Sequence, residues 1–203
     1  EHQLEENILR DRNRANIIIW SLANETPVNE ARYLFLSKLA AHARKLDSTR
    51  LISAALEKHY ESDSIAVVDD PLAGLLDILA FNEHIGWYDG LPAKCNLVSW
   101  KIPYDKPIFI SEFGGGAKYG YHGNANERWT EEFQEDLYIQ SLNMIDKIDG
   151  LCGISPWILT DFRSPRRPLS GIQDYFNRKG LLSEKGEKKL AFYILQSYYK
   201  RKN

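Results

Sequence analysis

The sequence predicts an α/β fold with a parallel sheet, and three observations support this. Apolar runs that read as strands alternate with helical patterns, and they begin near residues 17, 51, 77, 107 and 152. Several of these runs are apolar at successive positions, as is typical of strands buried on both faces of a parallel sheet. The loops after the strands are long and polar, whereas most turns that lead into the strands are short.

The first third of the chain gives two helices and two strands. Residues 3–13 have a helical pattern among charged residues, and a strand follows at 17–20. Asn29 can cap a helix that runs to Leu46, because apolar residues then recur with the helical period. Residues 51–56 are predicted to form the next strand.

The middle of the chain gives shorter elements. A polar loop is expected around His59, and a short helical turn at 71–76. The next strand covers 77–81, and a short helix is expected within 91–101. A strand at 107–111 then leads into three glycines and a polar loop.

The last part of the chain gives two helices around one strand. Thr130 can cap a long helix with two glutamates in its first turn, where the helix dipole favours negative charge. A strand is predicted over 152–158, followed by a long loop with three arginines. The last helix is expected to begin near Gly186.

Length and composition limit the possible classes. At 203 residues the chain can bury a sizeable core, and we expect one domain. A net charge of −2 gives no electrostatic reason to expect a nucleic acid or membrane partner. No apolar run is long enough for a membrane span, and no signal peptide is recognised, so localisation stays unknown. Cys95 and Cys152 have no metal-type spacing and are expected to be free, buried thiols.

The number of strands leaves two architectures open. A complete (β/α)8 barrel needs eight strands and about 250 residues, whereas about five strands are visible here. The chain therefore forms either an open sheet or only the later βα units of a barrel.

Two of the strands end in a glutamate, Glu25 and Glu112. Active sites of barrels lie at the carboxyl ends of the strands, where a carboxylate contributes little to packing. A pair of carboxylates facing one pocket suits glycoside hydrolysis, in which one group protonates the leaving oxygen and the other attacks the sugar. The alternative is that both glutamates are helix caps or surface ion-pair residues.

Four motifs occur in order along the chain. They are S-L-A-N-E at 21–25, N-E-H-I-G-W-Y at 82–88, S-E-F-G at 111–114 and S-P-W-I-L-T-D-F at 155–162. Together they resemble glycoside hydrolase family 2, and specifically the second part of its TIM-barrel domain. The resemblance extends over essentially the whole chain. It implies a β-glycosidase with a retaining, exo-acting mechanism and with neither a metal nor an organic cofactor.

The resemblance also implies roles for single residues. Glu25 matches the general acid/base, and Asn24 matches the residue that holds the sugar 2-hydroxyl. Glu112 matches the nucleophile. Asn82 and Tyr88 match residues of the sugar pocket.

Further residues concern the sugar itself. Trp157 matches an aromatic platform on the last strand, although plain core packing is the alternative for Trp157 and Tyr88. Family members that cleave β-glucuronides carry an N-x-K element before the final helix, and Asn177 and Lys179 stand at the matching place. An amide and an ammonium group can distinguish a uronate from a neutral hexose. The alternative is a basic turn before a helix.

Three arginines precede this element, Arg163, Arg166 and Arg167. They either add to an acid-binding rim or are simply solvated. A departure from the family pattern is His84, where members commonly have a tyrosine hydrogen-bonded to the nucleophile. An imidazole can also hydrogen-bond to a carboxylate, but it would tune the nucleophile differently.

The sequence also departs from the family in its domains. Residues 1–203 correspond to part of the catalytic barrel, without the β-sandwich and immunoglobulin-like domains that precede the barrel in family members. We expect a fragment with weak activity or none on its own. Its expected partners are a carbohydrate substrate, and either the N-terminal part of the same enzyme or further copies of the chain.

Two other functions stay open at this point. One is a β-galactosidase or a related exo-glycosidase, which keeps both glutamates but needs no acid-binding lysine. The other is a non-catalytic fragment that binds sugar or assembles with another chain. A nucleotide-binding α/β protein is not supported, because the glycines 114–116 match neither the G-x-G-x-x-G nor the Walker pattern.

Overall fold

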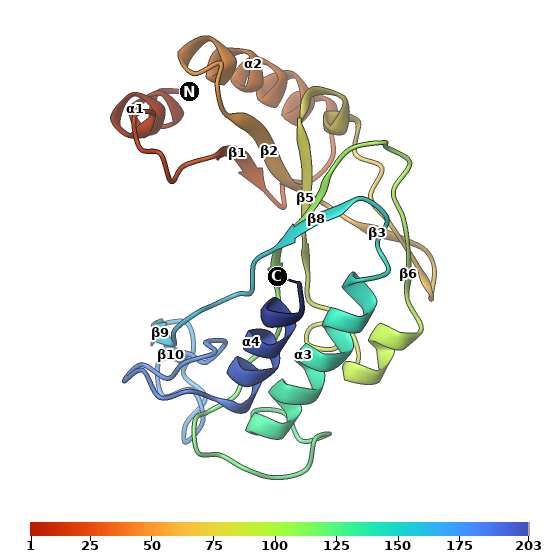
Figure 1. The fold of residues 1–203 in the computed structure, drawn as a ribbon, viewed down its shortest axis with the longest axis vertical. Helices are drawn as coiled ribbons and strands as arrows, with labels where there is room; N and C mark the ends of the chain where they lie inside the picture. The colour runs from red at the N-terminus through yellow and green to blue at the C-terminus, as the bar shows by residue number, and fades with distance from the viewer. Residues whose placement is uncertain (203) are drawn as a thin grey trace. The chain divides into compact units, whose positions relative to one another are not determined.

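A parallel sheet of five strands is the framework of the chain in a computed structural model that describes residues 1–202 (Figure 1). The strands are hydrogen-bonded in the order β1 (Ile19–Asn24), β2 (Leu51–Leu56), β5 (Ile78–Glu83), β7 (Ile108–Phe113) and β8 (Leu151–Ile154). Spatial order follows chain order, as expected of consecutive βα units. The predicted α/β fold with the later units of a barrel is confirmed.

The chain divides into two compact units. The first unit comprises residues 1–82, 99–111 and 148–153, and the second comprises 83–98, 112–147 and the chain from 154 on. The sheet belongs to the first unit except for the last residues of β5, β7 and β8. Each unit is described separately below.

Two helices accompany the sheet in the first unit. They are α1 (His2–Asp11) and α2 (Glu30–Leu46), and they lie side by side (Figure 1). Asn29 caps α2 as predicted, because its side-chain oxygen accepts a hydrogen bond from the Arg32 amide at 2.9 Å. The short 3-10 helix η1 (Pro71–Leu75) also lies where a helical turn was predicted.

A second, small sheet in the first unit corrects two predictions. It joins β3 (His59–Ser62), β4 (Ile65–Val67) and β6 (Ser99–Lys101), where a polar loop and part of a helix were expected. Ile65 pairs with Ser99 in parallel register, so the pairing joins segments far apart in sequence. Only η2 (Pro92–Asn96) is helical within 91–101. Such long-range pairing has no local signal in the residues that form it.

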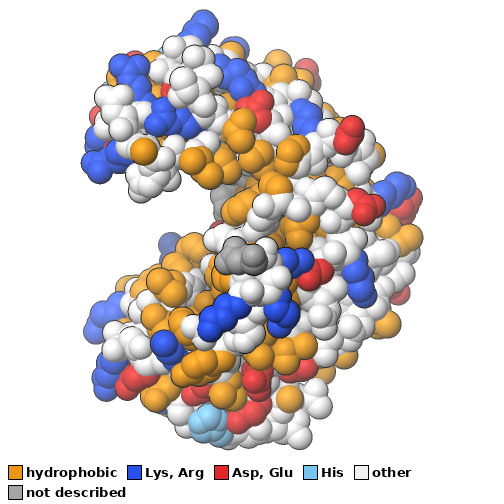
Figure 2. Space-filling view, in the orientation of Figure 1, with side chains coloured by type: hydrophobic (Ala, Val, Ile, Leu, Met, Phe, Trp, Pro, Cys, Tyr) orange, Lys and Arg blue, Asp and Glu red, His pale blue; other side chains and the backbone are white. Residues whose placement is uncertain are grey.

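Two helices form the core of the second unit. Helix α3 (Glu131–Ile145) is capped by Thr130, which accepts a hydrogen bond from the Phe133 amide at 3.0 Å. Helix α4 (Leu190–Lys202) packs against α3. It begins later than predicted, because Gly186 has a φ of 88° and lies in a turn closed on Ser183. Hydrophobic side chains gather beside α4 on the face seen in Figure 2.

The region after β8 also differs from the prediction. The strand ends at Ile154 and does not continue to residue 158, since Pro156 cannot donate to a sheet. Two short antiparallel strands follow, β9 (Phe162–Arg163) and β10 (Phe176–Asn177). Cys95 is buried as predicted, but Cys152 is exposed, because β8 is the last strand in the sheet order.

Residues 1–202 contain neither a membrane-spanning helix nor a cluster of metal-ligating side chains. No helix there is both long and apolar enough to cross a membrane. No group of three or more histidine, cysteine, aspartate or glutamate side chains there could hold a metal ion.

Candidate functional site

In the first unit, amide side chains connect the carboxyl ends of three strands. The Asn82 amide donates a hydrogen bond to the side-chain oxygen of Asn24 at 3.0 Å. The side-chain oxygen of Asn82 in turn accepts from the Ser111 hydroxyl at 2.7 Å. Asn24 ends β1, Asn82 lies in β5 and Ser111 lies in β7. Neutral hydrogen bonds between the three strands therefore orient the two asparagines. The predicted pair Asn24 and Asn82 is therefore in contact.

Glu25 follows Asn24 directly and has an unusual backbone. Its φ is 47°, a conformation that costs energy in a residue other than glycine and that clusters at functional sites. Its amide donates to the Ala55 carbonyl at 3.0 Å, next to an irregularity in the pairing of β1 with β2. The side chain is exposed and forms no ion pair with any residue of the described chain. Its carboxyl group is thus open to a ligand.

In the second unit, Glu112 lies beside His84, the histidine of the N-E-H-I-G-W-Y motif. The Glu112 carboxylate is 3.6 Å from Nε2 of His84, and both side chains are largely buried. Nδ1 of His84 is 2.8 Å from the Gly114 carbonyl oxygen. A carbonyl oxygen only accepts, so this contact is a hydrogen bond when Nδ1 carries a proton of the ring.

Gly114 has to be a glycine because Tyr138 packs closely against it. It has a φ of 104°, and a Cβ atom added there would lie 2.6 Å from the Tyr138 hydroxyl. No other residue type fits this position without displacing Tyr138. The S-E-F-G motif therefore ends in glycine for a structural reason.

Three predicted residues of the second unit meet at one cavity of about 200 Å³. The Lys179 ammonium is 2.5 Å from the Tyr88 hydroxyl and 4.2 Å from the centre of its ring. The Asn177 side-chain oxygen accepts from the Lys179 amide at 3.1 Å. The residues that line the cavity are Trp87, Tyr88, Arg128, Trp129, Arg167, Gln173, Asn177 and Lys179.

The charge of this lining is entirely positive. Arg128, Arg167 and Lys179 contribute cations, and no aspartate or glutamate belongs to the lining. Burial of the Tyr88 phenol would raise its pKa, but hydrogen bonds and positive charge from Lys179 and Arg167 outweigh burial and lower the pKa below its ordinary value. The cavity is therefore suited to a ligand with a negative group.

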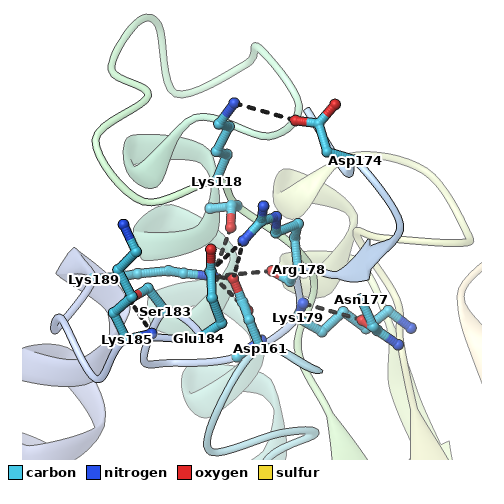
Figure 3. Close-up of polar contacts among 12 residues, drawn as sticks. Lys118, Asp161, Asp174, Asn177, Arg178, Lys179, Ser183, Glu184, Lys185 and Lys189 are labelled. Carbon is cyan, nitrogen blue, oxygen red and sulfur yellow. Dashed lines mark hydrogen bonds and ion pairs between the residues drawn. The ribbon is translucent and has the colours of Figure 1, made fainter. Parts of the chain in front are cut away.

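A buried ionic cluster supports the segment that carries Lys179 (Figure 3). The Lys189 ammonium, which has no exposed surface, lies 2.8 and 3.1 Å from the two carboxylate oxygens of Asp161. Arg178 approaches Asp161 at 3.4 Å and Glu184 at 2.5 Å. Burial raises the pKa of Asp161 and lowers the pKa of Lys189, although their pairing opposes both changes.

This cluster also fixes the backbone on both sides of Lys179. Asp161 accepts from the Gly180 amide at 2.8 Å, and Lys189 donates to the Arg178 carbonyl at 3.1 Å. A Cβ at Gly180 would lie 2.3 Å from the Asp161 nitrogen. In Figure 3 the side chains of Asn177 and Lys179 extend away from the cluster, and both line the cavity.

Trp157 lies apart from this lining. Its ring packs edge-on against Phe162 with 6.5 Å between ring centres, and its amide donates to the Phe113 carbonyl at 2.9 Å. Its role as a sugar platform stays a prediction. So does the prediction that Glu25 and Glu112 face one pocket.

Trp87 lines the cavity although sequence reasoning gave it no role within its motif, and three further residues of the cavity were missed altogether, Arg128, Trp129 and Gln173. Arg128 and Trp129 directly precede the cap of α3, and Trp129 has a φ of 77°. Gln173 lies in the loop between β9 and β10. None of these three belongs to a periodic pattern or a motif, so no signal in the sequence identifies them.

Comparison with known proteins gives one family throughout. The sequence profile described as glycosyl hydrolases family 2, TIM barrel domain, matches residues 2–202. A β-glucuronidase of Paenibacillus borealis is 28% identical over 205 residues, which are 94% of this chain and 32% of that protein. The β-glucuronidase of the dog, Canis lupus familiaris, is 28% identical over 98% of this chain and 31% of that protein.

Solved structures have the same fold. A β-galacturonidase from Eisenbergiella tayi, bound to galacturonate, superposes with a TM-score of 0.79 at 24% identity, over 98% of this chain and 35% of that one. A β-glucuronidase from Dictyoglomus thermophilum superposes with a TM-score of 0.76 at 24% identity, over 97% and 34%. The chain thus spans about a third of the length of these proteins.

Proposed function

Because the chain belongs to glycosyl hydrolase family 2, within its TIM barrel domain, we propose that it is part of a retaining, exo-acting β-glycosidase that cleaves terminal β-glucuronides. The choice of substrate rests on one observation. Asn177, Lys179 and Tyr88 meet at a cavity whose lining contains no carboxylate. The curated relatives that are named β-glucuronidases support the same choice.

In the proposed reaction Glu112 is the nucleophile. Its carboxylate attacks the anomeric carbon, and the bond from that carbon to the leaving oxygen breaks. Glu25 protonates the leaving oxygen, so that the aglycone departs as a neutral alcohol. Glu25 then removes a proton from water, which attacks the anomeric carbon and releases Glu112 as a free carboxylate. The sugar keeps its β-configuration after two inversions.

The neighbours of each glutamate suit these roles. Glu25 is exposed and free of ion pairs within the described chain, so its carboxyl group can pick up and release protons to a ligand and to water. The oriented Asn24 amide is proposed to hold the sugar 2-hydroxyl, and Asn82 to hold Asn24 in place. His84, whose Nε2 lies 3.6 Å from the Glu112 carboxylate, is proposed to position that carboxylate.

Recognition of the acid group is assigned to Lys179 and Asn177. An ammonium group and an amide can bind a carboxylate, and a neutral hexose offers no charge to either. A β-galactosidase-like enzyme would have no need of Lys179 in a cavity. The preference for a uronide over a neutral glycoside is therefore the feature that separates the two activities.

Hydrolysis of two chromogenic substrates tests this proposal. Turnover by this chain on its own is expected to be weak, but 4-nitrophenol should be released from 4-nitrophenyl β-D-glucuronide in preference to the β-D-galactoside. Glu112→Gln should abolish turnover, whereas the exposed control Glu57→Gln should leave it unchanged. Hydrolysis of the galactoside alone would contradict the acid-recognition role, and hydrolysis of either substrate that survives Glu112→Gln would contradict the nucleophile.

A further inference from the structure

The cavity beside Tyr88 contains more positive charge than the N-x-K element supplies. Lys179 accounts for one cation of its lining, and Arg128 and Arg167 add two more. Arg128 is committed to the protein, because it donates to the Trp87 and Gly90 carbonyls at 2.5 and 3.0 Å. Within residues 1–202, the Arg167 side chain donates no hydrogen bond to a backbone carbonyl, and its hydrogen-bond partner is the Tyr88 hydroxyl.

The carboxylates of this region are paired with other cations. Asp174 lies 3.6 Å from the ammonium of Lys118, which reaches across from another loop (Figure 3). Asp161 is bound by Lys189, and Glu184 is bound by Arg178 (Figure 3). Within residues 1–202, neither Lys179 nor Arg167 forms an ion pair with a carboxylate. Two cations at the cavity thus lack an anion.

The three arginines of this loop differ in position. Arg163 lies over the Phe176 ring, with 5.8 Å between the guanidinium carbon and the ring centre. Arg166 is exposed, and only Arg167 lines the cavity. The backbone at Arg167 is held on both sides, since its amide donates to the Ser164 carbonyl at 3.0 Å and its carbonyl accepts from the Tyr175 amide at 2.8 Å. The loop therefore presents Arg167 to the cavity from a fixed backbone.

The Tyr88 hydroxyl is where the two cations act together. The ammonium of Lys179 donates to it at 2.5 Å. Both Lys179 and Arg167 contribute hydrogen bonds and charge that lower the pKa of this phenol.

We infer that Arg167 is a second carboxylate-binding residue, which together with Lys179 holds the acid group of a terminal uronic acid beside the Tyr88 hydroxyl. A guanidinium group presents two parallel N–H donors that match the two oxygens of a planar carboxylate, and an ammonium group adds a point charge. The inference rests on the proposed function for the choice of a uronic acid as the sugar. It adds a specificity-determining residue that the N-x-K element does not contain.

Calorimetric titration of the purified chain tests the inference without turnover. The ligands are D-glucuronate, its neutral methyl ester and D-glucose 6-phosphate, each titrated into the wild-type chain, Arg167→Gln and the matched control Arg166→Gln. We expect D-glucuronate to bind best and the neutral ester poorly. Arg167→Gln should weaken glucuronate binding roughly tenfold, as for loss of a charged hydrogen bond, and Arg166→Gln should leave it unchanged. Thermal unfolding of each variant verifies that it is folded.

Three results would overturn the inference. They are equal glucuronate affinity in wild type and Arg167→Gln, equal loss in Arg166→Gln, and failure of the wild-type chain to prefer glucuronate over its ester. Tighter binding of D-glucose 6-phosphate than of glucuronate would also overturn it, because the group that the cavity binds would then be a phosphate and not a carboxylate. Glucuronate binding that depends on Arg167, without glucuronide hydrolysis, would support the role of Arg167 and contradict the proposed reaction. Glucuronide hydrolysis that is unaffected by Arg167→Gln would support the proposed reaction and contradict the role of Arg167.

Discussion

In the first unit, Asn24 and Asn82 are oriented by neutral hydrogen bonds, whereas in the second unit Lys179 stands on a framework of buried charges. Glu25 lies in the open with no ion pair in the described chain, while the cavity beside Lys179 is lined by cations. Both arrangements place polar side chains at strand ends or in the loops beyond them. The two regions differ in the charge around the residue of interest. Glu25 has no ion-pair partner in the described chain, whereas Lys179 lies among other charged side chains.

The difference follows from what each region is proposed to do. A group that must gain and lose a proton works best without a fixed counter-charge, which would hold it in one protonation state. A group that selects an anion works best when its own charge is unpaired and rigidly held. Proton transfer is thus assigned to the neutral surroundings of Glu25, and recognition of the acid group to the cationic cavity.

After Glu112→Gln, which should abolish turnover, the largest effect expected is that of Glu25→Gln on activity. Loss of a general acid slows catalysis by roughly 10²–10⁴-fold. The loss should be greatest for β-glucuronides with a poor leaving group, such as a simple alkyl alcohol, and least for 4-nitrophenyl β-D-glucuronide, which needs little protonation. Comparison of kcat/KM for the two substrates measures this. An equal loss for both would contradict the acid role and leave Glu25 with a structural one.

The charged framework of the second unit should be the costliest to break. Lys189→Met leaves Asp161 buried without its closest cation, and such a change destabilises proteins by roughly 3–5 kcal/mol. Urea unfolding of this variant beside the exposed control Lys185→Met measures the difference. Equal stability of the two variants would show that the buried pair contributes nothing beyond a surface lysine.

The first unit contains a buried aspartate, Asp47, whose pKa is lowered, whereas the pKa of Asp161 is raised. Burial would raise the pKa of Asp47, but hydrogen bonds from Thr49 and Trp20 and the charge of Arg50 lower it from 3.8 to about 2. Because the folded-state pKa is the lower one, Asp47 contributes stability that is present above pH 3.8 and lost as the pH falls through about 2.

Asp47→Asn should therefore be less stable than wild type near neutral pH, and the difference should shrink as the pH falls from about 4 to about 2. Thermal unfolding across this range measures it, with the exposed Asp149→Asn as control. A difference that stays constant with pH would mean that the charge of Asp47 is not what stabilises the fold.

The smallest effect expected is that of Ser111→Ala. The change removes the hydrogen bond to Asn82 at 2.7 Å and should cost about 1 kcal/mol of stability. Because Asn82 then orients Asn24 less firmly, kcat should also fall, by more than the smaller fraction of folded protein explains. The exposed control Ser99→Ala should change neither kcat nor the free energy of unfolding. An unchanged kcat in Ser111→Ala would separate the amide chain from the proposed reaction.

Local patterns predicted much of the fold. Asn29 and Thr130 cap their helices as expected, because a cap and its helix are neighbours in sequence. The five strands of the main sheet each begin within two residues of the predicted start. The small sheet was missed, because its pairing of Ile65 with Ser99 depends on tertiary structure alone.

The site divides in the same way. Lys179, Asn177 and Tyr88 were predicted from motifs, and the structure brings them to one cavity. Sequence alone did not separate Arg167 from its two neighbours, because the loop is shaped by β9 and β10, which are too short for any periodic pattern. Gln173 lies in the same loop and was missed for the same reason.

The most direct test of the division between chemistry and recognition is the ratio of kcat/KM for 4-nitrophenyl β-D-glucuronide to that for the neutral β-D-glucoside, in wild type and in Lys179→Gln. If Lys179 binds the acid group, the glucuronide value should fall roughly 10- to 100-fold, as for loss of a charged hydrogen bond, while the glucoside value should be unchanged. An equal fall for both substrates, or an unchanged ratio, would contradict this role, because Lys179 would then act on the reaction or on the fold and not on the acid group.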